Sequence, residues 1–334
     1  MTWAALKDVA LKMSMPTYAA GQMADWLYRK RITTIHQMTN LAASKREQLS
    51  VHYEIGSHLP VEATTSADGA VKYLFAVNDA NHFVESVFIP SDRRATLCVS
   101  SQIGCKMNCR FCMTGRQGFT AQLTANEMMN QIQSIPQNRE LTNLVFMGMG
   151  EPLDNIDELF KTLEILTSDY GYGWSPKRIT VSTIGLLPGL KRFLDESACH
   201  LAISLHSPFH DERLSLIPAE KAYPAARIIE LLHGYDFSHQ RRVSFEYILF
   251  EGFNDTAKHA SALVRMLKGL ECRVNLIRYH ALPNDDLRSC NEQKMEKFRN
   301  LLTAQGILST IRTSRGEDIF AACGMLSTAK KCKR

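Results

Sequence analysis

The sequence predicts an α/β fold: a partial, TIM-like (βα)6 barrel, preceded by a small helical domain and a β-rich connector. Two observations lead to this prediction. From residue 96 onward, six short apolar runs alternate with longer amphipathic segments, a pattern typical of parallel strands joined by helices. The chain has 334 residues, against roughly 150 for a typical domain, so it can hold a barrel and smaller modules.

The segments before the barrel have two different patterns. Residues 1–60 should form a helical accessory domain, because Met23, Trp26 and Leu27 follow the i, i+3, i+4 spacing of one helix face. Residues 61–94 show strand-like runs with turn signals between them and should form the β-rich connector. These runs are residues 61–65, 71–77 and 82–89, and the turn signals are Asp68-Gly69 and Asn78-Asp79.

Residues 95–334 should form the barrel and a C-terminal segment. The expected strands are residues 96–101, 143–150, 178–185, 200–207, 242–250 and 273–280. The helical signals between them are a capping box at Thr124 and Glu127, an apolar stripe from Ile156 to Leu166, a segment from Asn254 carrying Leu263, Leu267 and Leu270, and residues 291–302. In such barrels the carboxyl ends of the strands face the active site.

Composition excludes several classes of protein. Apolar residues make up 45% and charged residues 22%, which is far from a disordered or fibrous chain. No stretch approaches the roughly 18 apolar residues of a membrane helix, and the opening residues lack the apolar block of a signal peptide, so a cytoplasmic protein is expected. The net charge of +5 is a mild bias toward anionic partners. Nine cysteines, an odd number, favour reduced thiols with a metal or catalytic role.

Three of these cysteines form the strongest motif in the chain. Cys105, Cys109 and Cys112 lie within eight residues, just beyond the first expected barrel strand. Three thiolates on one loop can bind three irons of a [4Fe–4S] cluster and leave the fourth iron open to a small molecule. Zinc is the alternative, but structural zinc needs a fourth ligand, and the sequence offers none nearby. A third interpretation is three unligated cysteines.

The spacing Cys-x3-Cys-x2-Cys, with Phe111 before the last cysteine, resembles the signature of radical S-adenosylmethionine (SAM) enzymes. Five further segments narrow the resemblance to the RlmN/Cfr family of RNA (adenine) methyltransferases, and within it to RlmN. They are Glu85-Ser-Val-Phe-Ile-Pro, Ala95-Thr-Leu-Cys98-Val-Ser-Ser-Gln-Ile-Gly-Cys105, Gly148-Met-Gly-Glu-Pro-Leu153, Ser204-Leu-His206 and Asp318-Ile-Phe-Ala-Ala-Cys323-Gly. The resemblance covers nearly the whole chain. It implies a radical SAM barrel that uses a [4Fe–4S] cluster and SAM to methylate carbon 2 or carbon 8 of an adenosine.

The resemblance also implies roles for individual residues. The cluster ligands would be Cys105, Cys109 and Cys112, and the SAM contacts would be Gly150, Glu151, Ser182, Ser204, Leu205 and His206. Without the resemblance, Gly-Met-Gly-Glu-Pro is more often a turn than a site, and a single histidine is more often structural. Gly150 and Glu151 follow a strand end, where glycine allows close approach of the backbone and a carboxylate can accept from an ammonium group.

Two more cysteines acquire roles by the same resemblance. Cys323 would receive a methyl group from one SAM molecule, and a radical derived from a second would take a hydrogen from that methyl group before carbon adds to the adenine. Cys98 would then release the product and leave a Cys98–Cys323 disulfide. Glu85 would help in proton removal. Taken alone, each cysteine is more often a small buried hydrophobe; Cys199, Cys272, Cys290 and Cys332 are expected to be structural.

One position departs from the family pattern. After the last expected strand the family commonly has an aromatic residue and an asparagine that contacts SAM, whereas this chain has Tyr279 and His280. His280 can still form a hydrogen bond and is retained as a SAM contact. The Arg278-Tyr279 pair resembles the carbon-8 branch, and Pro152 resembles the carbon-2 branch. We predict carbon-2 methylation; the alternatives are a Cfr-like carbon-8 enzyme, a radical SAM enzyme with a non-RNA substrate, and a catalytically silent iron–sulfur RNA-binding protein.

The resemblance further implies the partners. The substrates would be 23S rRNA and, as in some family members, tRNA, with an electron donor such as flavodoxin or ferredoxin. We expect a monomer with no membrane association. Several basic residues could meet phosphates: Arg29, Lys30, Arg31, Lys177, Arg178, Arg241, Arg242 and the tail from Lys330 to Arg334.

Overall fold

The computed structural model describes residues 1–77, 81–238 and 242–328. The expected turn at Asn78-Asp79, the basic residue Arg241, the C-terminal basic tail and Cys332 lie outside these residues.

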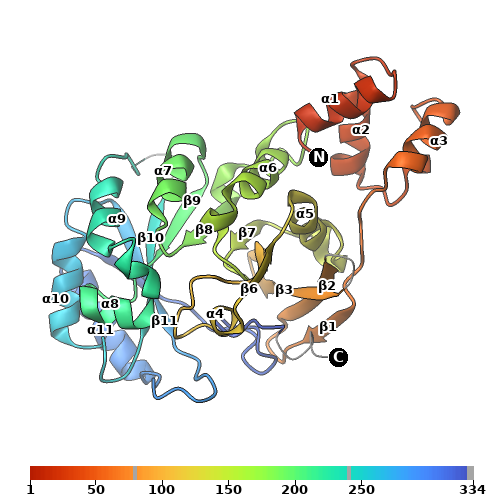
Figure 1. Cartoon of the computed structure of the whole chain (residues 1–334). Helices are drawn as coiled ribbons and strands as arrows, with labels where there is room; N and C mark the ends of the chain where they lie inside the picture. Colours follow the sequence, from red (N-terminus) through yellow and green to blue (C-terminus); the bar gives the residue numbers. More distant parts are fainter. Residues whose placement is uncertain (78–80, 239–241, 329–334) are drawn as a thin grey trace.

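The N-terminal segment is helical and stands apart from the rest of the molecule (Figure 1). Its elements are α1 (Trp3–Lys12), α2 (Ala19–Ala24), the π-helix η1 (Asp25–Lys30), the 3-10 helix η2 (Ile35–Gln37) and α3 (Ala43–His52). Met23 is buried among these helices, whereas Trp26 and Leu27 are half-buried. The backbone N–H of Trp3 donates to Tyr170 Oη at 3.1 Å, and Arg31 donates to Asn138 Oδ1 at 2.7 Å. These bonds dock the helical domain on the segments around α6.

One ten-stranded sheet forms the body of the protein, in the order β1-β2-β3-β4-β7-β8-β9-β10-β11-β12. β1 (Glu62–Thr65), β2 (Val71–Val77) and β3 (His82–Ser91) are antiparallel, and β3 pairs with β4 (Arg94–Cys98) from Val87↔Cys98 to Ser91↔Arg94. The β-rich segment therefore extends the barrel sheet itself.

From β4 onward every neighbouring pair is parallel, which confirms the predicted barrel. The remaining parallel strands are β7 (Asn143–Phe146), β8 (Ile179–Thr183), β9 (His200–Ser204), β10 (Val243–Leu249), β11 (Cys272–Arg278) and β12 (Leu308–Ile311). All six predicted strands are present. The sequence interpretation missed β12, because its four residues Leu-Ser-Thr-Ile carry no continuous apolar run.

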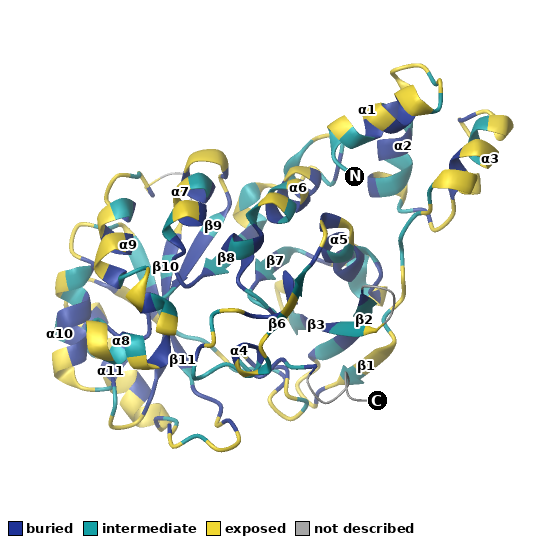
Figure 2. Cartoon of the chain, in the orientation of Figure 1, coloured by how far each residue is buried: buried dark blue, intermediate teal, exposed yellow. Residues whose placement is uncertain are grey.

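Helices cover the outside of this sheet (Figures 1 and 2). They are α5 (Ala125–Gln133), α6 (Ile156–Thr167), α7 (Leu187–Glu196), α8 (His210–Leu216), α9 (Ala225–Leu232), α10 (Ala257–Met266) and α11 (Glu292–Ala304). The short helix α4 (Met113–Gln117) lies instead between β5 (Gln102–Gly104) and β6 (Phe119–Gln122). Short 3-10 turns are η3 (Pro136–Arg139), η4 (Pro152–Asn155), η5 (Pro176–Arg178) and η6 (Pro218–Lys221). The capping box of α5 is confirmed, with Thr124 N–H donating to Glu127 Oε2 at 2.8 Å. α10 ends before Leu267 and Leu270, which lie in the following turn.

The core lies between the strands and these helices, where Phe146, Val181 and Phe245 are fully buried. A second, two-stranded sheet, β5 (Gln102–Gly104) with β6 (Phe119–Gln122), lies at the carboxyl end of β4 and frames the three-cysteine loop. Among the described residues, no helix is both long and apolar enough to cross a membrane.

Candidate active site

The three-cysteine loop is held closed by its own backbone. It leaves β5 at Gly104 and returns through α4 to β6, and Cys105 N–H donates to the carbonyl of Gly118 at 3.0 Å. Gly115 lies so close to Cys109 that a Cβ at position 115 would be 2.9 Å from the Cys109 nitrogen. Backbone contacts therefore define the shape of the loop.

Cys105, Cys109 and Cys112 are held in a desolvated environment. Burial raises the pKa of Cys105 to about 12 and also raises the pKa values of Cys109 and Cys112. The free thiols are thus protonated, and a bound metal must displace these protons. Among the described residues, no three His, Cys, Asp or Glu side chains are placed to hold one metal ion. In a [4Fe–4S] cluster, by contrast, each thiolate binds a separate iron, and the donor set fits such a group.

An open cavity of about 810 Å³ connects this loop with the carboxyl ends of the barrel strands. The predicted residues that line it are Cys105, Cys109, Cys112, Gly150, Glu151, Ser182, Ser204, His206 and Cys323. Four predicted site residues do not line it: Glu85, Cys98, Leu205 and His280.

Gly150 is required by the packing of the strand ends. Its φ is +101°, and a Cβ there would lie 2.5 Å from the Cβ of Gln102. The Gln102 side chain in turn accepts from the N–H of Glu151 at 2.8 Å. The sequence predicts that Gly150 leaves room for a ligand. In the structure, the missing side chain of Gly150 leaves room for Gln102 of β5.

Glu151 is a buried carboxyl group at the junction of β7 and β8. Its oxygens accept from Leu153 N–H at 3.0 Å and Ile184 N–H at 2.9 Å. Burial raises the pKa of Glu151 to about 7. The Glu151 carboxylate could form an ion pair with a cationic group bound in the cavity.

His206 follows β9 with a left-handed φ of +57°. Its Nδ1 accepts from Ile248 N–H at 2.9 Å, and its ring lies 4.5 Å from that of Phe111. Burial lowers the pKa of His206 to about 3, so the ring is neutral and carries its proton on Nε2. A neutral imidazole N–H is thus available at the cavity.

A buried arginine, which the sequence interpretation missed, joins these strand ends. Arg213 is 1% exposed and donates to the carbonyls of Ile184 at 2.7 Å and Ser204 at 3.0 Å. It also donates to the carbonyl of Leu205 at 3.1 Å, and it is paired with the buried Glu220. Leu205 contributes its backbone to this arrangement, while its side chain is buried in the core.

Cys98 and Cys323 have opposite environments. Cys98 is buried at the end of β4, and burial raises its pKa to about 12. Cys323 is exposed and lines the cavity in the segment that follows β12. Both are free thiols, and each lies within electrostatic range of the other and of Arg312.

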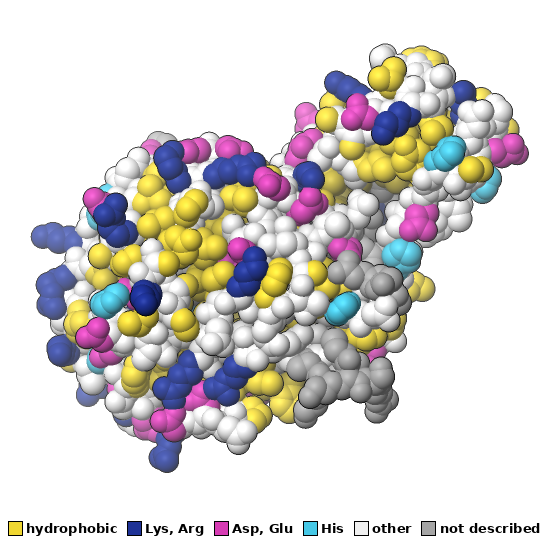
Figure 3. Space-filling view, in the orientation of Figure 1, with side chains coloured by type: hydrophobic (Ala, Val, Ile, Leu, Met, Phe, Trp, Pro, Cys, Tyr) yellow, Lys and Arg dark blue, Asp and Glu magenta, His cyan; other side chains and the backbone are white. Residues whose placement is uncertain are grey.

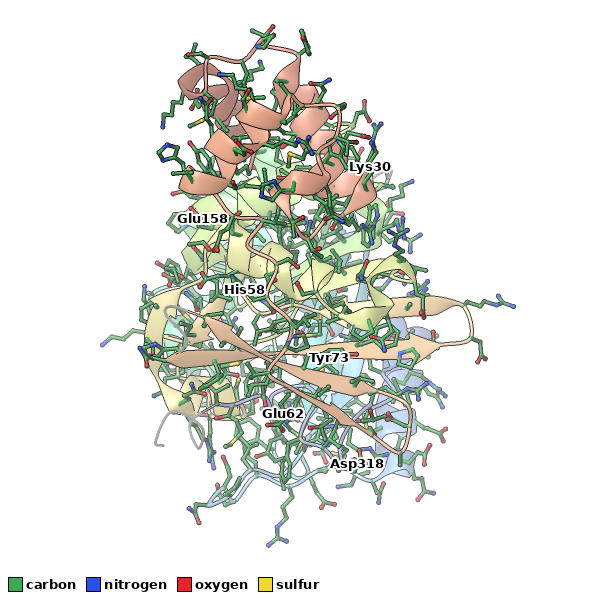
Figure 4. All side chains as sticks on the ribbon, turned by 90° about the vertical axis from the view of Figure 1, so that its right-hand side faces the viewer. Lys30, His58, Glu62, Tyr73, Glu158 and Asp318 are labelled. Carbon is green, nitrogen blue, oxygen red and sulfur yellow. The ribbon has the colours of Figure 1, made fainter. Side chains whose placement is uncertain are left out.

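Bonds on two sides hold the segment that carries Cys323. Met113 N–H donates to the carbonyl of Gly324 at 2.7 Å, beside the three-cysteine loop. On the other side, Ser66 Oγ donates to Asp318 Oδ1 at 2.5 Å, and Figure 4 shows Asp318 near the β1–β2 end of the sheet. Cys323 is therefore positioned by both the loop and the antiparallel extension.

Glu85 and His280 contact this C-terminal region. Glu85 is buried, pairs with Lys72 Nζ at 3.1 Å, and accepts from Ser327 N–H at 3.0 Å. His280 Nε2 lies 3.1 Å from Ser314 Oγ. In this arrangement both residues hold the segment around Cys323, and neither reaches the cavity wall.

Two charged residues that were not predicted, Glu246 and Arg312, also line the cavity. Glu246, on β10, is 3% exposed and accepts from Arg312 at 3.2 Å and from Asn275 Nδ2 at 2.7 Å. Arg312 directly follows β12. The alternation of β10 could have indicated Glu246, since a charged residue there interrupts an apolar run, whereas Arg312 depends on the strand that was missed.

The fold and the three-cysteine loop at the carboxyl ends of its strands define a radical SAM enzyme. Residues 99–263 match the family model of the radical SAM superfamily, and residues 1–55 match that of the ribosomal RNA large subunit methyltransferase N-terminal domain. A radical SAM methyltransferase from Sphaerobacter thermophilus has a similar structure, with a TM-score of 0.91 and 38% identity, covering 98% of this chain and 97% of that one.

Named relatives identify the family. The chain is 66% identical to a probable dual-specificity RNA methyltransferase RlmN of Parabacteroides distasonis, over 99% of this chain and 96% of the relative. It is 40% identical to the dual-specificity RNA methyltransferase RlmN of Marinobacter nauticus, over 92% of this chain and 86% of the relative. The chain belongs to the RlmN family of radical SAM RNA methyltransferases. The enzyme uses a [4Fe–4S] cluster and SAM, which excludes zinc, unligated cysteines and a catalytically silent protein.

Proposed function

We propose that this enzyme methylates carbon 2 of an adenosine in 23S rRNA and in tRNA, by way of a methylated Cys323 and a covalent RNA intermediate. One observation carries the proposal: Cys323 lines the same cavity as the three cluster cysteines, and Cys98 lies within electrostatic range of Cys323. A methyl carrier must be reached both by a SAM sulfonium and by the radical formed at the cluster. A one-electron donor such as flavodoxin or ferredoxin would supply the electron.

Different residues of the chain would bind the cluster and SAM. Cys105, Cys109 and Cys112 would hold the cluster, which with SAM supplies the hydrogen-abstracting radical. Glu151 would accept hydrogen bonds from the SAM ammonium, and its carboxyl group is fixed for this by two backbone N–H groups. Ser182, Ser204 and the Nε2–H of His206 complete the polar wall.

The two remaining cysteines would act in sequence. The thiolate of Cys323 would attack the methyl carbon of one SAM molecule, release S-adenosylhomocysteine and become a methyl thioether. After the carbon of this group has joined the adenine ring, and the adduct has lost the ring proton and returned one electron to the cluster, the Cys98 thiolate would attack the Cys323 sulfur. The carbon–sulfur bond breaks, a proton completes the new methyl group, and the Cys98–Cys323 disulfide remains. Glu85, which holds the adjacent Ser327, would assist proton removal.

Nucleoside mass spectrometry of rRNA and tRNA from a deletion strain tests the proposal. We expect 2-methyladenosine to be lost and to return on complementation. Appearance of 8-methyladenosine instead would identify the Cfr-like alternative.

A further inference from the structure

A second cavity, of about 1120 Å³, lies inside the barrel on the side opposite the three-cysteine loop. Its rim is formed where the parallel strands begin, and it is basic. The basic residues of this rim, here called the basic mouth, are Arg94 at the start of β4, Lys177 before β8, Arg242 before β10 and Arg273 on β11. Four cations, each at or near the start of a different strand, thus surround one opening.

Among the described residues, these four cations lack the carboxylate partners that some other surface cations have. Elsewhere Lys and Arg are interspersed with Asp and Glu (Figure 3), and exposed cations form pairs such as Lys191–Asp195 at 2.6 Å. Within the part of the chain that the structure describes, none of the four side chains of the basic mouth has a carboxylate partner. Burial and the nearby charges of Arg242, Lys177 and Arg273 lower the pKa of His200, at the same opening, to about 4. The mouth therefore concentrates unbalanced positive charge.

The interior behind the mouth is polar. The inside of a closed β/α barrel is normally filled by layers of apolar side chains. Here the lining includes Thr96, Thr180, Ser244, Asn275 and Thr310. Polar lining of this kind suits a lumen occupied by water or by the polar groups of a ligand rather than by a packed apolar core.

The lumen adjoins the active site. Met147, Glu246 and Arg312 line both the second cavity and the one that contains Cys323. On the far side of the active site, the three-cysteine loop and the segment around Cys323 are bonded together, with Thr114 Oγ1 donating to the carbonyl of Leu326 at 2.6 Å. A nucleotide that enters from the mouth would thus reach the methyl carrier without displacing this segment.

We propose that RNA docks its phosphates on the basic mouth and that the target nucleotide enters the barrel lumen from this side, toward Arg312 and Cys323. This inference rests on the proposed function in taking RNA as the substrate. A nucleotide that has left its stack can enter such a lumen, while cations at the rim hold the flanking phosphates. Positive charge focused at a cleft also accelerates the encounter with a polyanion.

Binding of a labelled RNA hairpin, measured by fluorescence anisotropy over a range of salt concentrations, tests the docking surface. The variant Arg242→Ala/Arg273→Ala should bind about tenfold more weakly near physiological salt, and the slope of log affinity against log salt should become shallower by about 1 to 2. The matched control, Arg265→Ala/Lys268→Ala, removes two exposed cations from the α10 region and should bind like wild type. Equal affinity and slope for the mouth variant and wild type would overturn the proposal.

The route through the lumen needs a second variant. Thr180→Trp, on β8, should fill the lumen, so RNA should still bind while methyl transfer to RNA is lost. Iron content equal to that of wild type shows that each variant has folded. Full RNA methylation by Thr180→Trp would refute entry from this side. If wild type places no methyl group on carbon 2 but the mouth variant still loses RNA binding, the proposed function fails and the docking surface stands.

Discussion

Cys98 and Cys323 show how the environment of a single residue can separate two chemical tasks. Cys323 lies at the cavity, where substrates arrive, whereas Cys98 is buried and has a raised pKa. A buried thiol is a poor nucleophile until it loses its proton. Arg312, within electrostatic range of Cys98, favours the thiolate form of Cys98.

We predict that Cys98→Ala stalls after carbon has joined the RNA, because no thiolate remains to attack the Cys323 sulfur. A covalent protein–RNA adduct should appear on denaturing gels with labelled RNA and should map to the peptide containing Cys323. The double variant Cys98→Ala/Cys323→Ala should form no adduct. Release of free methylated RNA by Cys98→Ala at the wild-type rate would contradict the resolving role.

His206 should make stability depend on pH. Its pKa is about 3 in the folded protein, against an ordinary value of 6.5 for a solvated histidine, so the unfolded state takes up the proton first as pH falls. This contribution to stability is complete above pH 6.5 and is lost progressively as the pH falls from there toward 3. From about pH 7 to about pH 5.5 we expect a loss of about 1 kcal/mol from this residue. Chemical denaturation at both pH values, compared with His206→Asn, measures the difference; an equal loss in the variant would show that His206 does not contribute. The opposite effect of Glu151, whose pKa is raised, is common to both proteins.

At the scale of elements, the three-cysteine loop is a preformed turn between β5 and β6. We predict about four irons per chain after anaerobic reconstitution, and loss of the cluster in Cys105→Ala, Cys109→Ala and Cys112→Ala. Cys272→Ala, on β11, is the control and should keep its iron. Iron analysis and visible absorption measure the outcome, and full iron in all three loop variants would disprove the assignment.

α8 and the strand ends it covers are joined by Arg213. Its removal leaves the buried Glu220 without its buried cationic partner, with His210 and the Ala225 N–H still bonded to it, and takes one donor away from each of three carbonyls. We predict that Arg213→Met lowers the free energy of unfolding by about 3–5 kcal/mol. The double variant Arg213→Met/Glu220→Gln should lose less than the sum of the two single variants. Denaturant titration tests this cycle, and strict additivity would mean that the two side chains are not coupled.

At the scale of the whole molecule, the helical domain is attached by the linker of residues 53–61 and by a few side-chain contacts. Figure 4 shows this linker, marked by His58, running between the helices and the sheet. Arg31 supplies two of the contacts: a bond to Asn138, and a position 4.8 Å above the ring of Tyr172.

Arg31→Ala should therefore loosen the helical domain, and limited proteolysis should cut the linker several times faster, because proteases cleave locally opened segments. Lys12→Ala removes an exposed cation from α1 and should leave the rate unchanged. No difference between the two variants would show that other contacts dock the domain.

Much of the fold could be predicted because its signals are local. Six of the seven parallel strands lie in runs rich in apolar residues, and Thr124 with Glu127 marks the start of α5 without any tertiary information. β12 has no such run, so its place beside β11 depends on pairing across a crossover. The sequence predicts the strands of the β-rich segment, but it does not predict that β3 pairs with β4, because this pairing forms only when the whole sheet assembles.

The sequence by itself determined the chemistry: three closely spaced cysteines, the residues of the family motifs and hence the family. The identity and spacing of the ligands along one loop are local features, so they can be recognised from the sequence alone. Only the tertiary structure decided that Arg213 joins the strand ends, that Glu85 and His280 hold the Cys323 segment, and that four cations surround one opening. These arrangements bring together residues from separate strands and helices, and their distances are set by packing and burial that no single segment encodes.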